Sequence, residues 1–108
     1  METIKIETEL VEETLEVRLI GEFDLQSFDA VDEVLGNAMM GGGHDLLVDL
    51  RGVTFIDSSG IRALMRAESR AVAAGRHLRL IKGPENVHRV FVLAGLDTRL
   101  DIANGDGS

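Results

Sequence analysis

The first part of the chain alternates between apolar and charged side chains, a period of two that is typical of half-buried β-strands. Ile4 and Ile6 alternate with charged residues, and the same alternation returns from Leu15 to Leu19. Two acidic residues and a threonine, 12–14, lie near the connection. The pattern therefore predicts two strands joined by a short turn, each with one buried and one solvated face.

Apolar residues at helical spacing follow in three later segments. The first helix would begin after Asp24, whose carboxylate can cap it, and would end before the glycines 41–43. A second helix would run from about Ser58 to Ala74, and a third from residues 83–86 to a glycine cap at Gly95. The positions predicted to face the core are Leu25, Phe28, Val31, Val34, Leu35 and Ala38, then Ile61, Leu64, Met65, Ala71 and Val72, then Val87, Val90, Phe91 and Ala94.

Short apolar runs between these helices predict the remaining strands. Residues 46–50 form a run typical of a strand buried on both faces, and residues 51–56 lead from it to Asp57. Residues 77–81 predict a further strand, and Leu100 with Ile102 a last short one. The order β-β-α-β-α-β-α-β predicts an α/β fold with a mixed four- to five-stranded sheet and three to four helices packed on it.

The length and the composition bound the domain organisation and the class of function. A chain of 108 residues suits a single domain, with a core over about residues 3–102 and a disordered tail at 104–108.

The absence of cysteine excludes disulfides and thiolate sites. Four aromatic residues and a net charge of −8 argue against nucleic-acid binding. No apolar run approaches the roughly 20 residues of a membrane helix. We expect a cytoplasmic domain without membrane insertion.

The negative charge is concentrated at the start of the sequence. Residues 1–33 carry 11 acidic and two basic side chains, whereas residues 34–108 carry eight acidic and nine basic ones. Most of the early acids fall on the solvated face of the predicted strands or in their turn, where charge protects a sheet edge from aggregation. Asp24, close to Glu22, is the early acid for which we expect a functional role.

The strongest candidate for a functional site is the segment Asp-Ser-Ser-Gly at residues 57–60. It follows an apolar strand and opens an amphipathic helix, a place where free amides and the helix dipole favour an anion. These residue types also cap helices and form turns, so the segment alone is compatible with a purely structural role. The sequence contains no Gly-x-Ser-x-Gly motif, phosphate-binding loop, dinucleotide fingerprint or histidine pair at metal-ligand spacing.

Three separated motifs resemble the STAS family, and most closely its bacterial anti-sigma factor antagonists. Residues 57–60 resemble the Asp-Ser-Ser/Thr-Gly turn of that family, and residues 21–24, Gly-Glu-Phe-Asp, resemble its Gly-Glu-hydrophobic-Asp. Residues 94–96, Ala-Gly-Leu, resemble its small-Gly-Leu segment. The likeness extends over about residues 4–102. It departs from the family at Arg62, where many antagonists have a small residue.

The resemblance implies a phosphorylation-switched binding protein that is not an enzyme. It makes Ser58 the phosphorylated residue, with Ser59 as the second choice. An anti-sigma factor with serine kinase activity would phosphorylate the serine with ATP, and a PP2C-type phosphatase would reverse the modification. The unmodified chain would bind the anti-sigma factor and release the sigma factor, and it would need no cofactor or metal of its own. We expect the partner to contact Asp24, Asp57, Ser59, Gly60, Arg62 and Arg66.

Arg62, Arg66 and Arg70 recur every four residues and therefore share one face of the predicted second helix. This face is either an ordinary solvated surface or a contact strip for an acidic partner. Arg62 could also reach a phosphate group on Ser58, four residues earlier.

Two alternatives to the antagonist remain. The same fold could serve as the STAS subunit of a lipid (ABC) transporter or of a stress-sensing complex. A more remote alternative is a serine hydrolase that uses Ser58 or Ser59. The hydrolase needs a base such as His88 beside the serine, and no feature of the sequence places one there. His44, His77 and His88 are expected at the surface.

Overall fold

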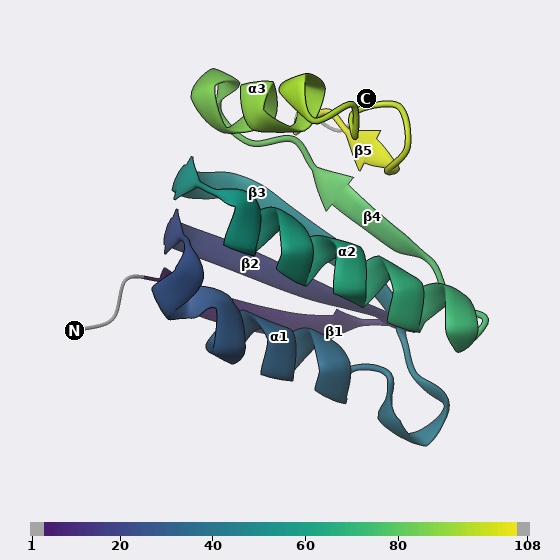
Figure 1. Cartoon of the computed structure of the whole chain (residues 1–108). Coiled ribbons are helices and arrows are strands. Elements are labelled where there is room, and N and C mark those ends of the chain that lie inside the picture. Colours follow the sequence, from purple (N-terminus) through teal and green to yellow (C-terminus); the bar gives the residue numbers. More distant parts are fainter. Residues whose placement is uncertain (1–3, 106–108) are drawn as a thin grey trace.

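In the computed structural model, which describes residues 4–105, three α-helices pack on a five-stranded sheet (Figure 1). The strands are β1 (Ile4–Val11), β2 (Thr14–Phe23), β3 (Asp45–Ile56), β4 (Leu78–Ile81) and β5 (Ile102–Ala103). The helices are α1 (Phe28–Asn37), α2 (Ser58–Ala73) and α3 (Glu85–Leu93), with 3-10 turns η1 (Leu25–Ser27) and η2 (Met40–Gly42). The predicted fold class and order of elements are confirmed.

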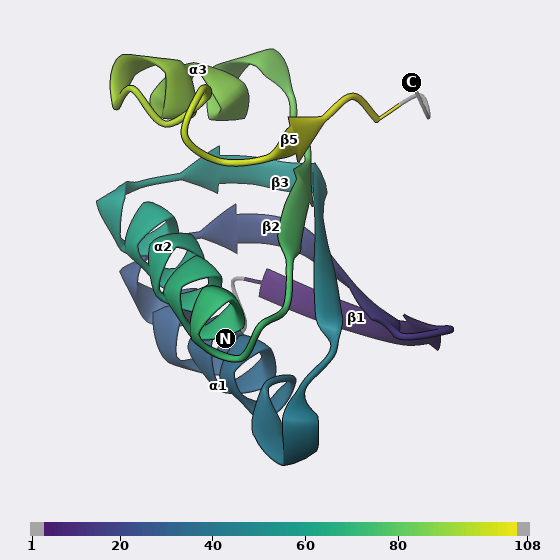
Figure 2. The same ribbon diagram turned by 90° about the vertical axis from the view of Figure 1, so that its right-hand side faces the viewer.

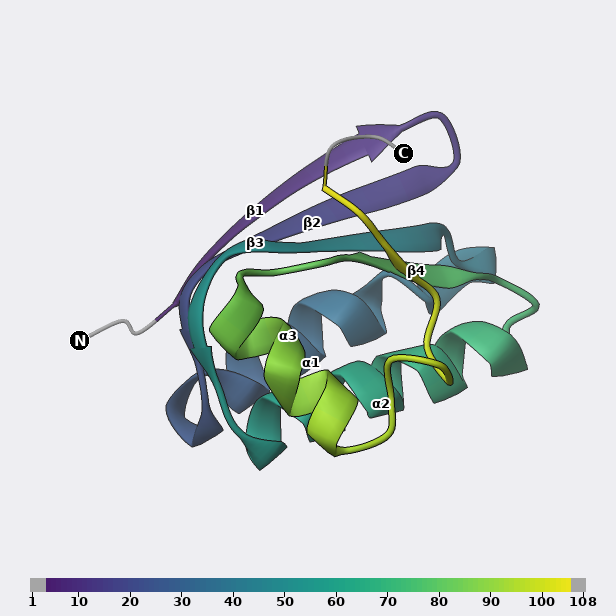
Figure 3. The same ribbon diagram turned by 90° about the horizontal axis from the view of Figure 1, so that it is seen from above.

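The strands lie side by side in chain order, β1-β2-β3-β4-β5. The β1–β2 pair is an antiparallel hairpin, and all later pairs are parallel. Each parallel pair from β2 to β5 needs a crossover, and α1, α2 and α3 provide these crossovers on one side of the sheet (Figures 2 and 3). The apolar core therefore lies between the helices and one sheet face, and within residues 4–105 no helix covers the other face.

Three of the positions predicted to face the core are exposed instead. Leu25 is 68% exposed because it lies in η1, whose three-residue turn shifts it off the stripe that begins in α1. Val72 is 69% exposed because the buried stripe of α2 continues through Ala71, and the next residue is rotated by about 100°. Ala94 is exposed at the C-cap of α3. The two glycine stops are confirmed, because Gly75 and Gly95 both have positive φ.

The central strand differs most from its prediction. β3 continues through residues 51–56, which were expected only to lead on to Asp57. Only one face of β3 packs against helices, because the helices of the described residues all lie on one side of the sheet. Leu46, Val48 and Leu50 point into the core, whereas Asp49 is buried on the uncovered face with only 6% exposure.

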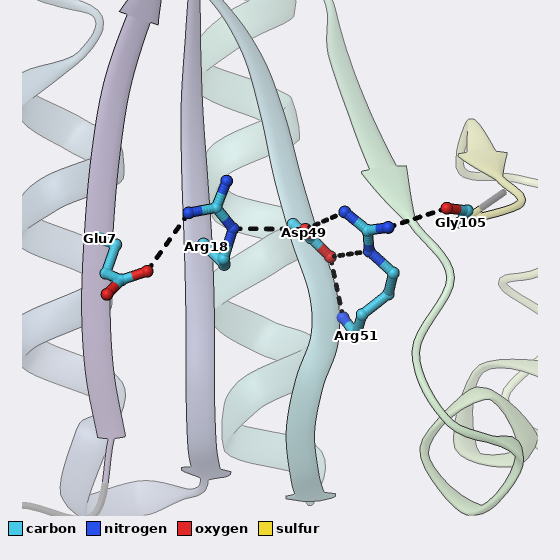
Figure 4. Close-up of polar contacts among 5 residues, drawn as sticks. All are labelled: Glu7, Arg18, Asp49, Arg51 and Gly105. Atoms are coloured by element: carbon cyan, nitrogen blue, oxygen red, sulfur yellow. Dashed lines mark hydrogen bonds and ion pairs between the residues drawn. The ribbon is translucent and has the colours of Figure 1, made fainter. Parts of the chain in front are cut away.

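Asp49 is buried by the arginine side chains that bind it (Figure 4). Arg51 donates to both carboxylate oxygens, at 3.0 Å from Nε and 2.7 Å from Nη2, and its backbone amide donates at 3.0 Å. Arg18 Nε lies 3.7 Å from the same carboxylate and Arg18 Nη1 donates to Glu7. Burial acts to raise the pKa of Asp49, but the hydrogen bonds from Arg51 and the charges of both arginines hold it below its ordinary value. This ion cluster ties β1, β2 and β3 together across the open face.

We expect Asp49→Asn to lower the free energy of unfolding by about 1–2 kcal/mol at neutral pH, because charge-assisted hydrogen bonds are lost but the arginines are partly solvated. Because the pKa of Asp49 is lowered in the folded state, its full contribution to the free energy of unfolding is present above the carboxyl's unfolded pKa of about 4. It is lost as the pH falls through the folded pKa, so the variant and the natural protein should converge in acid. Chemical denaturation from pH 7 to pH 3 measures this.

Glu7→Gln is the matched control, since it removes the same charge from the same cluster at a position more exposed than Asp49. It should change the stability little. An Asp49→Asn effect no larger than that of the control would show that the cluster is an ordinary surface network.

The expected tail from residue 104 falls partly outside the described residues, which end at 105. Within them, the Gly105 carbonyl oxygen accepts a 2.8 Å hydrogen bond from Arg51 Nη1, and the disorder expected for the tail stays a prediction. The structure also differs at residues 100–102, because β5 begins at Ile102 and Leu100 is buried ahead of it.

Candidate functional site

The candidate site lies where β2 and β3 end side by side. Phe23 pairs with Ile56 in the parallel register, and the Asp57 amide donates to the Phe23 carbonyl oxygen at 3.3 Å. The next residue of each strand is an aspartate, Asp24 or Asp57, and each begins a helical segment at the same edge of the sheet (Figure 1). The structure thus brings together two of the predicted site residues that are 33 positions apart in the sequence.

Asp24 caps η1 and thereby the start of α1. Its Oδ1 accepts hydrogen bonds from the amides of Gln26 at 3.1 Å and Ser27 at 3.3 Å. The buried hydroxyl of Ser27 accepts from the Asp24 amide at 2.9 Å and contacts the Glu22 carbonyl oxygen at 3.0 Å. Ser27 was not among the predicted site residues, although its position three residues after Asp24 matches the spacing of a capping box.

Asp57 caps α2 in the same way. Its Oδ1 accepts from the amides of Ser59 at 2.8 Å and Gly60 at 3.3 Å. This corrects the expectation of free amides at the helix start, because the carboxylate already satisfies two of them. Ser58 occupies the first helical position and its side chain is exposed, whereas Ser59 is half-buried. Of the two serines, Ser58 is therefore the more open to a macromolecular partner.

Gly60 fixes how closely α2 approaches the strand ends. A Cβ at this position would lie 2.7 Å from the Phe23 carbonyl oxygen and 2.7 Å from Ile56 Cγ1. Such distances are shorter than real carbon contacts, so only glycine fits here. Packing therefore requires a glycine at position 60, and its close approach to the strand ends sets the position of the turn that carries Ser58.

Exposed apolar side chains adjoin the capped turn in the sequence and in the sheet. Leu25 follows Asp24 directly, and Phe55, 48% exposed, lies two residues before Asp57 and pairs with Glu22 across the sheet. We call Glu22, Leu25, Phe55 and Ser58 the switch surface. Neither apolar residue was predicted as part of the site, because Leu25 was assigned to the core and Phe55 to a connecting segment.

The arginines of α2 face the neighbouring helix α1. Arg66 and Arg70 both bind Asp32, each with a 3.0 Å contact to Oδ1, and the hydrogen bond from Arg66 is the largest cause that lowers the pKa of Asp32. The Arg62 guanidinium lies 4.7 Å from the centre of the Phe28 ring. Together with Met65 and Ser69, the three arginines line a surface hollow of about 340 Å³.

This arrangement makes the arginine face a shared helix–helix surface as well as a candidate contact strip. Asp32 was not predicted to take part, and no sequence signal links it to residues 34 and 38 positions later. The use of Arg62 and Arg66 by a partner stays a prediction.

The histidines offer no support for the hydrolase alternative. His44 and His77 precede the parallel strands β3 and β4, so they lie at the opposite sheet edge from Ser58, which follows β3. The His77 ring bonds Asp101 at 2.7 Å, and the His88 ring stacks on Phe91 at 6.3 Å. Between residues 4 and 105 there is no group of three His, Cys, Asp or Glu side chains placed to hold a metal ion. Within the same range, no helix is both long and apolar enough to cross a membrane.

Comparisons with known proteins find a matching family, similar sequences and similar folds. The family model described as "Mlab, STAS domain" matches residues 6–102. An anti-sigma-B factor antagonist of Staphylococcus epidermidis is 26% identical over 102 residues, which are 94% of each chain. An anti-sigma factor antagonist from Mycobacterium paratuberculosis superposes with a TM-score of 0.83 at 21% identity, covering 92% of this chain and 84% of that one.

A third similar protein has been solved in two states. The anti-sigma factor antagonist SpoIIAA in its unphosphorylated form has a TM-score of 0.78, covering 95% of this chain and 90% of that one. SpoIIAA of Bacillus in its phosphorylated form has a TM-score of 0.72, covering 95% and 93%. Both are 21% identical to this chain.

The mixed sheet with helices on one face, and the acid-capped turn at the ends of β2 and β3, define a single α/β domain of a recognisable class. With a family model matched over nearly its whole length, the chain belongs to the STAS domain family.

Proposed function

We propose that this protein is an anti-sigma factor antagonist whose binding surface is switched by phosphorylation of Ser58. The observation that carries the proposal is the exposed hydroxyl of Ser58 at the first position of α2, directly after the capping Asp57. In the unmodified state the chain binds an anti-sigma factor with serine kinase activity in the cytoplasm, and the sigma factor is released. The antagonist itself catalyses no reaction and holds no cofactor.

The modification is a phosphoryl transfer catalysed by the partner. The Ser58 Oγ attacks the γ-phosphorus of the partner's ATP, an Oγ–P bond forms, and the bond to the ADP oxygen breaks. The hydroxyl proton passes to a base of the kinase or to water. A PP2C-type phosphatase reverses the step by transferring the phosphoryl group to water.

The site tolerates the phosphate locally but changes what can bind there. A phosphoserine adds a charge of about −1.5 to −2, and the positive end of the α2 dipole lies beneath it, so the fold is retained. The carboxylates of Asp24 and Asp57 lie at the same sheet edge and repel the new charge. A partner that covers Leu25 and Phe55 would have to desolvate this dianion, and binding is lost without a large conformational change.

The predicted partner-binding residues divide by what they do in the fold. Asp24, Asp57 and Gly60 hold the two capped helix starts in place, so they shape the contact more than they supply it. Ser59 donates its amide to the Asp57 carboxylate. We propose that the contact itself is made by the switch surface and extends along α2 to Arg62 and Arg66.

Phosphosite mapping tests the proposal directly. The purified chain is incubated with ATP and a soluble extract of its source cell, and modified residues are located by mass spectrometry. We expect a phosphate on Ser58 that disappears in Ser58→Ala and persists in Ser59→Ala. Modification of Ser59 alone, or none on either serine in an extract that phosphorylates other proteins, would contradict the proposal.

Co-purification distinguishes the transporter alternative. An antagonist should retain a small protein with serine kinase activity, whereas a transporter subunit should retain a transport ATPase. The fold is compatible with both, and the exposed phosphorylatable serine favours the first.

A further inference from the structure

Arg62 is placed to reach the group that Ser58 would carry. The two residues are four positions apart on α2, and residues at this spacing lie on the same helix face with Cβ atoms about 5–6 Å apart. Because the side chains of a helix lean toward its N-terminus, the Arg62 side chain can extend over the turn that contains Ser58. Both side chains are exposed, and a phosphate between them would remain at the surface.

Arg62 differs from the other two arginines of its face in what it contacts. Arg66 and Arg70 are bound to the carboxylate of Asp32, which leaves them engaged within the chain. The Arg62 guanidinium lies over the Phe28 ring at 4.7 Å, and in the described residues no carboxylate lies within ion-pair distance of it. An exposed cation–π contact is weak, whereas arginine binds a phosphate with two charge-assisted hydrogen bonds.

The backbone at the start of α2 cannot take over this role. The Asp57 carboxylate occupies the amides of Ser59 and Gly60, which would otherwise face an anion at the helix start. The same carboxylate and that of Asp24 add negative charge to this edge. With these two amides occupied, a side-chain cation is the stronger partner for a phosphate on Ser58, and Arg62 is the arginine on this face without an acidic partner among residues 4–105.

We propose that Arg62 is a phosphate latch, which leaves the Phe28 ring when Ser58 is phosphorylated and binds the phosphate oxygens. The inference rests on the proposed function in that Ser58 carries the phosphate. The latch halves the added charge at the switch surface, so loss of partner binding depends on the bulk and hydration of the phosphate as well as on repulsion. It also holds the phosphate against the protein's own surface, which slows its removal.

Phosphorus NMR of the full chain tests the latch without any kinase, because phosphoserine can be incorporated at position 58 during translation. The second pKa of a phosphoserine is about 6, and a neighbouring cation lowers it. We expect Arg62→Gln to raise this pKa by about half a unit, which corresponds to an exposed ion pair. Arg62→Lys should restore only part of the difference, because lysine lacks the planar fork of donors.

Arg66→Gln is the matched control, since it removes the same charge from the same helix face one turn further on. It should leave the phosphoserine pKa almost unchanged. Equal shifts in Arg62→Gln and Arg66→Gln would reduce the effect to general electrostatics and overturn the latch. No shift in either would overturn it as well.

A second measurement follows Arg62 itself. In the unmodified chain the Phe28 ring should shift the Arg62 side-chain proton signals upfield, and phosphorylation should abolish this shift. Arg62 proton signals that keep this upfield shift after phosphorylation would contradict the proposal. Because neither measurement uses a cellular kinase, failure of the latch and failure of the proposed phosphorylation circuit remain separate results.

Discussion

Replacement of Gly60 by alanine should destabilise the protein by about 2–3 kcal/mol, within the range for overpacking a filled core. The added Cβ would lie 2.7 Å from the Phe23 carbonyl oxygen and from Ile56 Cγ1, and 3.0 Å from Cγ of the Phe23 ring. None of these atoms can move freely, since Phe23 is fully buried and Ile56 is 4% exposed. Relief requires α2 to move away from the strand ends. Thermal or chemical denaturation measures the loss, and amide shifts at residues 57–60 should report the displacement.

Gly36→Ala is the control that separates this clash from the general effect of replacing a helical glycine. Gly36 lies inside α1, and a Cβ there would lie 3.0 Å from Arg70 Nη1, the far end of a flexible side chain. Alanine is also the better helix former, so this variant should keep or slightly raise the stability. Equal unfolding transitions for Gly60→Ala and the natural protein would refute the account of how the turn is positioned.

Much of the site could be predicted because its determinants are local. An Asp followed by small polar residues at the start of an apolar helical pattern is a capping signal, and the structure has caps at both Asp24 and Asp57. The glycine stops at Gly75 and Gly95 follow from the same kind of short-range reasoning. The resemblance to antagonists indicated which of the two serines is the phosphorylated one. The exposure of Ser58 is consistent with that choice.

Other features depend on tertiary arrangement and leave no local pattern. The run at residues 46–50 is as apolar as a strand covered on both faces, but the crossovers place every helix on one side, and Asp49 is buried by arginines instead. Leu25 fits a helical stripe, but a 3-10 turn rotates it to the surface. Asp32 binds Arg66 and Arg70 only because α1 packs beside α2. The periodicity of a sequence indicates which apolar residues share one face of an element. It does not indicate whether helices cover one side of a sheet or both.

Phosphorylation of Ser58 should lower the affinity for the anti-sigma factor by about 100-fold or more, because like charge and the desolvation of a phosphate dianion at an interface together cost several kcal/mol. The fold should survive, since the charge lies at the favourable end of the α2 dipole and outside the core. Near-identical amide spectra away from residues 24–28 and 55–62 would show that the change is confined to the surface. The loss of affinity therefore reports on the switch surface and not on unfolding.

The most direct test of the central claim is the dissociation constant of the purified anti-sigma factor, measured by calorimetry with the unmodified chain and with phosphoserine at position 58. Phosphoserine in place of Thr98 is the control, because Thr98 is exposed and precedes β5, at the opposite ends of the parallel strands from Ser58. The account predicts tight binding of the unmodified chain, a loss of about 100-fold or more with phosphoserine at position 58, and a much smaller change with phosphoserine at position 98. Equal affinity of the unmodified and Ser58-phosphorylated chains would contradict it.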